Sequence, residues 1–457
     1  MNLFTPTDRR PVHFVGIGGA GMSALALIAC RRGVVVSGCD TDPSGAADLA
    51  AMGVSVLQGH DPSHLDGVRA VVVTAAVSAG HPELDRARSL GLPIVPRKAA
   101  LAALIGDARS VAVAGTHGKT TTTVMCTEAL TAAGLAPTGI AGGRVSAWGG
   151  NARLAGDDLF VVEADEYDQA FLTLHPTVAV VNNVEPDHLE CYGSMAALED
   201  AFVEFAGRAE TAVVSADDAG ARLVAARLHR STRRFGFADD ADIRIAGMTQ
   251  HADRTEATVH FRGGRTLPVR LKVPGVHNLR NAVAALGAVD ALGGDLTRAA
   301  GALAEFAGVG RRFERLGEHR GVAVVDDYAH HPSELAATLA AARQAYPGRR
   351  LVAVFQPHLY SRTALHGQAM GEALAAADLV VVTEIYAARE QPVDGVSGRQ
   401  VAEAARGAGA EVRFEPSRVD VSRRVFEALV PGDVVLTLGA GDITRVGPEL
   451  VRWLDAA

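Results

Sequence analysis

The sequence predicts an α/β protein whose domains are built on largely parallel sheets. Short apolar runs alternate with helix-compatible stretches along nearly the whole chain, and turn residues separate them. Two of these runs lead directly into glycine-rich turns, each followed by a helical pattern. This alternation is typical of βαβ units, and 457 residues are enough for about three domains of ordinary size.

The apolar pattern falls into three blocks, which we expect to be domains at residues 1–107, 108–309 and 310–457. Strands of the first block are expected at residues 12–15, 34–37, 71–74 and 94–95. The second block predicts strands at 159–163, 178–182 and 212–215, a late antiparallel hairpin at 258–261 and 267–271, and helices at 278–292 and 296–306. The third repeats the alternation, with strands at 322–326, 351–355, 379–383, 412–414 and 434–438.

Composition excludes several classes of function. A net charge of −8 argues against a general nucleic-acid binder and against a membrane-surface binder. No window approaches the ~20 apolar residues needed to span a bilayer, and the first ten residues lack the apolar core of a signal peptide. The four cysteines have no paired ligand spacing, which argues against a zinc or disulfide framework. We therefore expect a cytoplasmic protein.

The second block opens with a turn suited to binding phosphate. An apolar run ending at Ala114 enters a glycine-punctuated turn, followed by a helix-compatible stretch. Such a turn directs backbone N–H groups and a helix N-terminus at an anion. Lys119 can reach the β- and γ-phosphates of a nucleotide, and the hydroxyl of Thr120 can ligate Mg²⁺. The expected nucleotide-binding residues are Gly115, Thr116, His117, Gly118, Lys119, Thr120 and Thr121.

One feature supports this interpretation and one leaves it open. The chain has three lysines against 41 arginines, so a lysine inside this loop suggests a need for a compact point charge. However, Val113 stands where the full phosphate-loop pattern has its first glycine. An ordinary strand–turn–helix corner is the alternative.

The first block carries a second glycine-rich turn, of the form G-x-G-G-x-G. Gly16 permits a tight turn, Gly18 and Gly19 let a pyrophosphate approach the backbone, and Gly21 allows close packing of the helix. Asp40 ends the next strand, where an acidic side chain could bind a ribose. These features predict a Rossmann-like domain. They do not distinguish an NAD site from a UDP-sugar site.

Acidic and histidine side chains follow two strands of the second block. Glu163 begins a run with four carboxylates among six residues, and such a run at a strand end favours a cation. Asp187 and His188 follow the next strand, beyond Pro186. We interpret Glu163 as a metal ligand and His188 as a ligand of a second metal or an aligner of substrate. A solvated acidic loop and a structural histidine are the alternatives.

Together these motifs resemble the Mur ligase family. The resemblance rests on Gly115 to Thr121, Glu163 to Glu166, Pro186 to Glu190 and, in the first block, Gly16 to Ala26. It implies three domains: a Rossmann-like N-terminal domain that binds a UDP-sugar, a central P-loop ATPase-like domain, and a Rossmann-like C-terminal domain that binds an amino acid. It also implies ATP-dependent amide bond formation in peptidoglycan precursor synthesis, through an acyl phosphate.

Within the family, the first glycine-rich turn resembles the branch that joins L-alanine to UDP-N-acetylmuramate. Several relatives support their second metal with a carbamylated lysine beyond the Asp-His motif. No lysine lies between Lys119 and Lys272 here, as expected for the L-alanine-adding branch. The substrates implied are UDP-N-acetylmuramate, L-alanine and ATP, with Mg²⁺ as cofactor, and the protein is expected to be a monomer or a weak homodimer.

The resemblance also assigns roles to individual residues. Lys119, Glu163, His188 and Arg312 would be catalytic, and Thr120, Glu163 and His188 would hold Mg²⁺. The UDP-substrate would be bound by Gly16, Gly18, Gly19, Ala20, Gly21, Met22, Ser23 and Asp40. His277, Asn278, Asn281 and Asp327 would contact the adenosine of ATP, although the two asparagines could also be helix caps. Arg312 could equally be part of a surface basic pair.

The amino-acid site is expected in the third block. Tyr328 and His330 would face the amino acid, while His358 and Arg362 would hold its carboxylate and phosphate oxygens, as a guanidinium fork can. Leu359 stands where some relatives have a basic residue, so the resemblance does not carry over one contact at this position. Three other functions stay open at this point: a recycling ligase that attaches a murein peptide to the same sugar nucleotide, an NAD-dependent oxidoreductase, and a non-catalytic nucleotide sensor.

Overall fold

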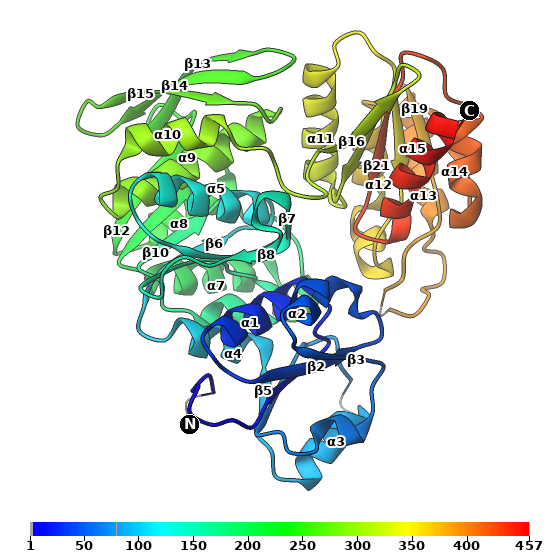
Figure 1. Cartoon of the computed structure of the whole chain (residues 1–457). Helices are drawn as coiled ribbons and strands as arrows, with labels where there is room; N and C mark the ends of the chain where they lie inside the picture. The colour runs from blue at the N-terminus through cyan, green and yellow to red at the C-terminus, as the bar shows by residue number, and fades with distance from the viewer. Residues whose placement is uncertain (1–2, 79, 389, 457) are drawn as a thin grey trace. The chain divides into compact units, whose positions relative to one another are not determined.

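A computed structural model describes residues 3–78, 80–388 and 390–456, which form two compact units (Figure 1). The first unit comprises the chain up to Ala246 together with Thr258–Val269 and Arg280–Leu303. The second unit comprises Gly247–Ala257, Arg270–Leu279 and the chain from Ala304 onward. Strands and helices alternate in both, which confirms the predicted α/β class. The three-domain boundaries at 107/108 and 309/310 stay predictions.

The first glycine-rich turn lies on a five-stranded parallel sheet of the first unit, in the order β3-β2-β1-β4-β5. Its strands are β1 (Val12–Val15), β2 (Val36–Asp40), β3 (Ser55–Gln58), β4 (Ala70–Val73) and β5 (Ile94–Pro96). Its helices are α1 (Ala20–Arg31), α2 (Ala47–Ala51), α3 (Pro82–Ser89) and α4 (Arg97–Ile105). The strand β3 was not predicted, because this half-exposed edge strand has polar residues at both ends.

The phosphate-binding turn belongs to a ten-stranded sheet with the order β15-β14-β13-β12-β11-β10-β6-β9-β7-β8. Its strands are β6 (Arg109–Ala114), β7 (Thr138–Val145), β8 (Gly150–Arg153), β9 (Leu159–Glu163), β10 (Val178–Val181), β11 (Thr211–Ser215), β12 (Ser231–Gly236), β13 (Ile243–Gln250), β14 (Thr255–Phe261) and β15 (Thr266–Leu271). Its helices are α5 (Lys119–Ala132), α6 (Leu189–Tyr192), α7 (Met195–Gly207), α8 (Ala219–Arg227), α9 (Val276–Ala291) and α10 (Leu296–Ala304).

The centre of this sheet positions the candidate site. Strand β6 pairs in parallel with β9 on one side and with β10 on the other, so three carboxyl ends lie side by side. All three strands are apolar and almost wholly buried, as expected for a parallel sheet covered on both faces. Val113 is a fully buried residue of β6 and pairs with Val180 and Glu163. The position where a glycine was expected is therefore part of the strand, and the turn begins only at Gly115.

The second unit contains a six-stranded sheet in the order β16-β17-β21-β18-β19-β20. Its strands are β16 (Glu314–His319), β17 (Val322–Asp327), β18 (Leu351–Phe355), β19 (Leu379–Val382), β20 (Glu411–Phe414) and β21 (Val434–Leu438). Edge strand β16 runs antiparallel to β17, and the other pairs are parallel. Its helices are α11 (Pro332–Ala345), α12 (Tyr360–Leu374), α13 (Gly398–Gly407), α14 (Arg418–Phe426) and α15 (Val446–Ala456). Within the described ranges, no helix is both long and apolar enough to cross a membrane.

Candidate active site

The phosphate-binding turn needs glycine at two positions. Gly115 has φ +136° and Gly118 has φ +79°, values that side chains other than glycine rarely adopt. A Cβ atom at Gly115 would also lie 3.0 Å from Cβ of Asn182 and 3.1 Å from the backbone nitrogen of Asn183. Gly118 is the N-cap of α5, so the turn ends at a helix N-terminus, as predicted for anion binding.

Residues after β10 fix the shape of this turn. The Asn183 side-chain oxygen accepts a hydrogen bond from the backbone of His117 at 2.7 Å, and the Asn182 amide donates to Thr122 Oγ1 at 3.0 Å. The hydroxyl of Thr116 accepts from the backbone N–H of Glu185 at 2.8 Å. The sequence analysis assigned no role to the two asparagines. The available signal was their position, directly after a strand expected to neighbour the phosphate-binding turn.

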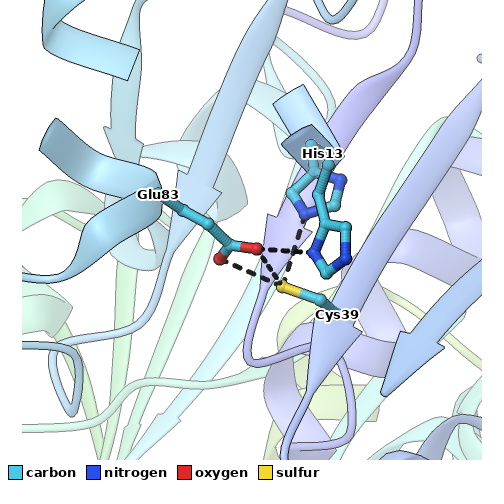
Figure 2. A group of neighbouring side chains, drawn as sticks. His13, Cys39 and Glu83 are labelled. Carbon is cyan, nitrogen blue, oxygen red and sulfur yellow. Dashed lines mark hydrogen bonds and ion pairs between the residues drawn. The ribbon is translucent and has the colours of Figure 1, made fainter. Parts of the chain in front are cut away.

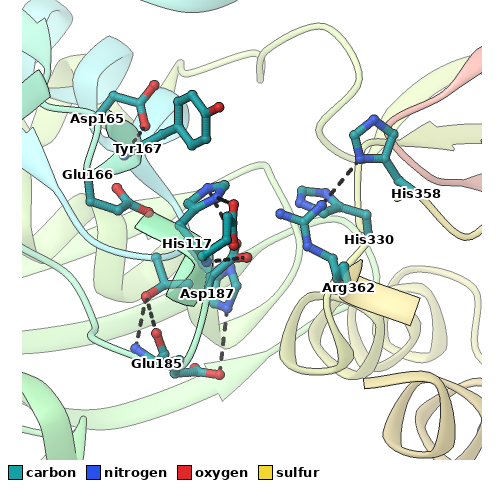
Figure 3. Close-up of polar contacts among 12 residues, drawn as sticks. His117, Asp165, Glu166, Tyr167, Glu185, Asp187, His330, His358 and Arg362 are labelled. Atoms are coloured by element: carbon teal, nitrogen blue, oxygen red, sulfur yellow. Dashed lines mark hydrogen bonds and ion pairs between the residues drawn. The ribbon is translucent and has the colours of Figure 1, made fainter. Parts of the chain in front are cut away.

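Lys119 is held by a carboxylate that the sequence analysis left without a role. Its Nζ lies 2.8 Å from each carboxylate oxygen of Glu166 and 2.8 Å from the carbonyl oxygen of Gly115. Burial works against the charge of Lys119, but the carboxylates of Glu166 and Asp165 outweigh burial and raise the pKa of the ammonium. Lys119 is therefore cationic and preorganised at the turn, and Figure 3 shows Glu166 next to Asp165.

The predicted magnesium ligands lie at the start of α5 and the end of β9. Thr120 and Thr121 occupy the first turn of α5, and both are buried. Glu163 pairs in register with Val113, so it ends its strand beside the phosphate-binding turn. One oxygen of Glu163 accepts from the backbone N–H of Gly142 at 2.5 Å. These side chains offer hydroxyl and carboxylate oxygens, the hard donors that Mg²⁺ prefers.

His188 lies in the same unit at the N-cap of α6. Its backbone is left-handed, with φ +54°, and its ring packs edge-to-face on Tyr167 at 5.1 Å between centroids. Its Nδ1 is 3.4 Å from a carboxylate oxygen of Glu190, and its Nε2 is 3.7 Å from one of Asp187. The ring is therefore oriented by acidic neighbours, in the way that second partners orient a metal-binding histidine.

The first glycine-rich turn is closed by Asp40. One oxygen of this carboxylate accepts from the backbone N–H of Gly18 at 2.9 Å, and the other accepts from Asp42 at 3.0 Å. Gly16 has φ +83°, and a Cβ atom at Gly18 would lie 2.6 Å from the Asp42 carbonyl oxygen. In this structure Asp40 shapes the turn, and a contact with ribose stays a prediction.

Helix α1 begins at Ala20, and its first turn meets residues from two other elements. Gly21 was predicted to allow close packing, and its close neighbour is a side chain: a Cβ atom there would lie 2.9 Å from Nη1 of Arg97. The amide of Asn151, on β8, donates to Ser23 Oγ at 3.2 Å and to the Ala20 carbonyl at 3.3 Å. Met22 is 2% exposed and its side chain belongs to the core, so any contact of Met22 with substrate would use its backbone.

Two basic residues of α4 connect this turn with the acidic run after β9. Nη2 of Arg97 is 3.7 Å from a carboxylate oxygen of Asp165, and Nζ of Lys98 is 2.8 Å from one of Asp168. Arg97 therefore lies between Gly21 and Asp165, while the adjacent Glu166 holds Lys119. The acidic run thus links the two glycine-rich turns within the first unit. Arg97 was not predicted as a site residue, because nothing in its local sequence places it near Gly21.

The three predicted adenine-binding residues lie in the first two turns of α9. Asn281 faces the phosphate-binding turn, since a Cβ atom at Gly118 would lie 2.7 Å from its side-chain oxygen. Asn278 is buried and donates its amide to the Pro274 carbonyl at 2.7 Å. His277 is the second residue of the helix. This bond holds Asn278 to the preceding loop, but it is not a helix cap, because a capping side chain accepts from backbone N–H groups.

In the second unit, Asp327 ends β17 and organises the loops around it. Its two oxygens accept from the backbone N–H groups of Phe313 at 2.7 Å and Ala329 at 2.8 Å. Burial raises the pKa of Asp327 to about 6, although Arg312 acts in the opposite direction. Arg312 lies over the ring of Tyr328, 5.0 Å from its centroid, and 3.7 Å from a carboxylate oxygen of Glu334. The contacts of Arg312 are therefore with residues near Asp327, and its catalytic role stays a prediction.

The four predicted amino-acid-binding residues lie together in the second unit. Nδ1 of His330 is 2.9 Å from the Tyr328 carbonyl oxygen, and the two rings pack edge-to-face at 5.3 Å. Nη1 of Arg362 is 3.3 Å from Nδ1 of His358. Figure 3 marks this contact. The rings of His330 and His358 are 6.1 Å apart. The neighbouring Tyr386, which had no predicted role, stacks on His358 at 5.8 Å.

Comparison with known protein families shows which family this chain resembles. Three family models match consecutive parts of the chain: the Mur ligase family catalytic domain at residues 11–109, the Mur ligase middle domain at 113–289, and the Mur ligase glutamate ligase domain at 311–441. The chain belongs to the Mur ligase family. The resemblance seen in the sequence is thereby confirmed.

Individual relatives match this Mur ligase over almost its whole length. A UDP-N-acetylmuramate–L-alanine ligase of Streptomyces griseus is 46% identical over 458 residues, covering 98% of each chain. The protein of the same name from Cutibacterium acnes is 44% identical and covers 100% of this chain and 98% of its own. Among solved structures, UDP-N-acetylmuramate–alanine ligase from Thermotoga maritima has a TM-score of 0.85 at 31% identity and covers 98% of this chain and 100% of its own. A murein peptide ligase from Psychrobacter arcticus has a TM-score of 0.73 at 25% identity and covers 98% and 99%.

Proposed function

We propose that this Mur ligase joins L-alanine to the carboxylate of UDP-N-acetylmuramate at the expense of ATP. One observation carries the proposal: within the first unit, the acidic run after β9 links the glycine-rich turn of β1 to the phosphate-binding turn of β6. A turn for a nucleoside diphosphate and a turn for a nucleoside triphosphate are thereby parts of one polar network. The full-length relatives that carry the name of this activity support the same substrates.

The reaction proceeds through an acyl phosphate. A carboxylate oxygen of the sugar attacks the γ-phosphorus of ATP, the bond from that phosphorus to the bridging oxygen breaks, and ADP leaves. The amine of L-alanine then attacks the acyl carbon, loses a proton and expels phosphate. Negative charge gathers on the transferring phosphoryl group, so a preorganised cation lowers the barrier. Lys119 fills that role, because Glu166 and the Gly115 carbonyl hold its ammonium at the turn.

The predicted Mg²⁺ ligands fit a hard cation by their chemistry. Thr120 offers a hydroxyl, Glu163 a carboxylate and His188 an imidazole, all within the first unit. When bound, magnesium would supply positive charge that stabilises the transferring phosphoryl group. Burial opposes the charge of Lys119, but the carboxylates of Glu166, Asp165 and Glu163 raise its pKa, so negative charge is concentrated where the cation is expected to bind.

The second unit supplies the amino-acid site in this proposal. Arg362, at 7% exposure, presents a guanidinium that can bind the carboxylate of L-alanine in a bidentate manner. His358 lies beside it, the ring of His330 is 6.1 Å from that of His358, and Arg312 lies over the ring of Tyr328. The remaining expectations are part of the proposal: adenosine contacts from His277, Asn278, Asn281 and Asp327, a monomer or weak homodimer, and a cytoplasmic location.

Phosphate release tests this function. It should require both UDP-N-acetylmuramate and L-alanine, and equal release without either substrate would contradict the ligase. A murein peptide ligase, named by one structural neighbour, would prefer a free tripeptide to L-alanine. An NAD-dependent oxidoreductase would produce a nicotinamide absorbance change, which we expect to be absent.

A further inference from the structure

Six side chains that can bind metals meet beside the five-stranded sheet of the first unit. They come from β1, β2, the segment after β3 and the start of α3, and they are His13, Cys39, His60, His64, His81 and Glu83. Figure 2 shows His13, Cys39 and Glu83 pointing toward one another. No role in the proposed reaction uses any of the six.

The distances within this cluster suit a single small cation. Sγ of Cys39 is 3.1 Å from each carboxylate oxygen of Glu83 and 3.4 Å from Nε2 of His13. Nδ1 of His64 is 2.8 Å from a Glu83 oxygen. One donor atom each from His13, Cys39, His64 and Glu83 all lie within 4.8 Å of one another. Zinc bond lengths place two ligands of a tetrahedral ion about 3.3–3.6 Å apart, and the contacts of Cys39 with Glu83 and His13 lie near this range.

We propose that Cys39, Glu83, His13 and His64 bind one Zn²⁺ ion as a structural site. A thiolate and a carboxylate together balance the charge of the ion, and two neutral imidazoles complete four ligands. Cys39, Glu83 and His13 are fully buried, so an ion and ligands whose charges sum to zero avoid the cost of an unbalanced charge in the interior. Thiolate and imidazole ligands favour zinc over magnesium or calcium.

The surroundings of the cluster support the same assignment. Nδ1 of His13 is 2.9 Å from Ser37 Oγ, so an Nδ1–H donor to this hydroxyl would leave Nε2 as the ligand atom facing Cys39. Metal-binding histidines are usually oriented by a hydrogen bond of this kind. His60 and His64 have side chains 22% and 15% exposed, which gives an ion a path from solvent.

Binding would exchange a proton for the ion. In the metal-free arrangement the Cys39 thiol donates to Glu83, and burial beside that carboxylate raises the pKa of the thiol. Zinc would take the sulfur lone pair as the S–H bond breaks, and the proton would leave to solvent. The Cys39 carbonyl accepts from the N–H groups of Gly16 at 2.9 Å and Ile17 at 3.1 Å. A metal at Cys39 would therefore brace the start of the UDP-binding turn.

The expectation that the protein has no zinc site rested on the spacing of its cysteines alone. Here one cysteine is joined by side chains from other elements, and Glu83 lies 44 residues beyond Cys39. A network held only by hydrogen bonds is the competing interpretation, and metal analysis separates the two.

Metal content of the full-length, tag-free protein tests the proposal. Protein purified with zinc supplied should hold about one ion per chain, as a four-ligand site does. Cys39→Ser should lose it, and the control Cys30→Ser, a partly exposed cysteine on α1, should keep it. Because Cys39 is buried, His64→Gln at the more exposed ligand is a second variant, with zinc affinity expected to fall at least about tenfold.

Cobalt gives a second readout. Co²⁺ added to the metal-free protein should produce a thiolate-to-cobalt charge-transfer band in the wild type and in Cys30→Ser, and none in Cys39→Ser. Equal zinc content in the wild type and Cys39→Ser, or cobalt binding without the thiolate band, would overturn the proposal in favour of hydrogen bonds alone.

Discussion

Glu166 binds Lys119 through both carboxylate oxygens, each 2.8 Å from Nζ, in a pair whose side chains are 2% and 17% exposed. The phosphate-binding lysine is therefore already positioned by a residue of the neighbouring strand end. Because Glu166 follows Asp165, which contacts Arg97, the same segment reaches the first glycine-rich turn. In the proposed function, the positioning of two anionic substrates depends on this short acidic run.

Replacing Lys119 should remove catalysis while sparing the sugar nucleotide. Lys119→Ala takes away the cation expected to stabilise the transferring phosphoryl group, whereas the UDP-binding turn lies on the separate five-stranded sheet. Turnover should become undetectable, with binding of UDP-N-acetylmuramate by calorimetry unchanged. Retention of more than about a tenth of kcat, about 1.4 kcal/mol in barrier, would count against the assigned role.

Replacing Glu166 should destabilise the fold. Glu166→Gln leaves a buried ammonium without its anion, and breaking such a pair costs about 3 kcal/mol. Asp168→Asn is the matched control, because Asp168 binds Lys98 at the same 2.8 Å but the side chains are 55% and 29% exposed, so its loss should cost under about 1 kcal/mol. Urea unfolding measures both, and equal losses would show that burial does not decide the strength of the Lys119 pair.

Arg97 should bind the diphosphate of the sugar nucleotide. Its guanidinium lies against Gly21 in the first turn of α1. Arg97→Ala should raise the Kd for UDP-N-acetylmuramate about tenfold, or about 1.4 kcal/mol, and leave ATP affinity unchanged. The control is Arg86→Ala on α3, whose exposed side chain pairs only weakly with Asp66 at 3.5 Å. If the two variants bind the sugar nucleotide equally well by calorimetry, Arg97 has no part in the site.

Asp327 should make the stability of the ligand-free protein depend on pH. Its folded pKa of about 6 lies above the ordinary 3.8, so the protonated form is favoured by folding. That contribution to stability is complete below pH 3.8 and is lost as the pH rises through 6. The stability of Asp327→Asn relative to the wild type should therefore improve by about 3 kcal/mol over this range. Urea titrations at both ends of the range measure it, and a constant difference would contradict the raised pKa.

The sequence was most informative where chemistry and local pattern coincide. Strand β9 ends at Glu163 as predicted, and Gly115 to Thr121 form the expected turn. Strands β7 and β12 were missed because the first is glycine-rich and the second carries two arginines, so neither has an apolar pattern. The contacts of Arg97 with Asp165 and of Cys39 with Glu83 join residues far apart in the chain, and only the folded sheet brings them together.

Acceptor-dependent phosphate release tests the central proposal most directly. With saturating ATP and UDP-N-acetylmuramate, kcat/KM should be compared for L-alanine, glycine, L-serine and the free murein tripeptide. We expect the highest value for L-alanine and negligible release without an acceptor. A higher value for the tripeptide, or release that does not depend on the acceptor, would contradict it.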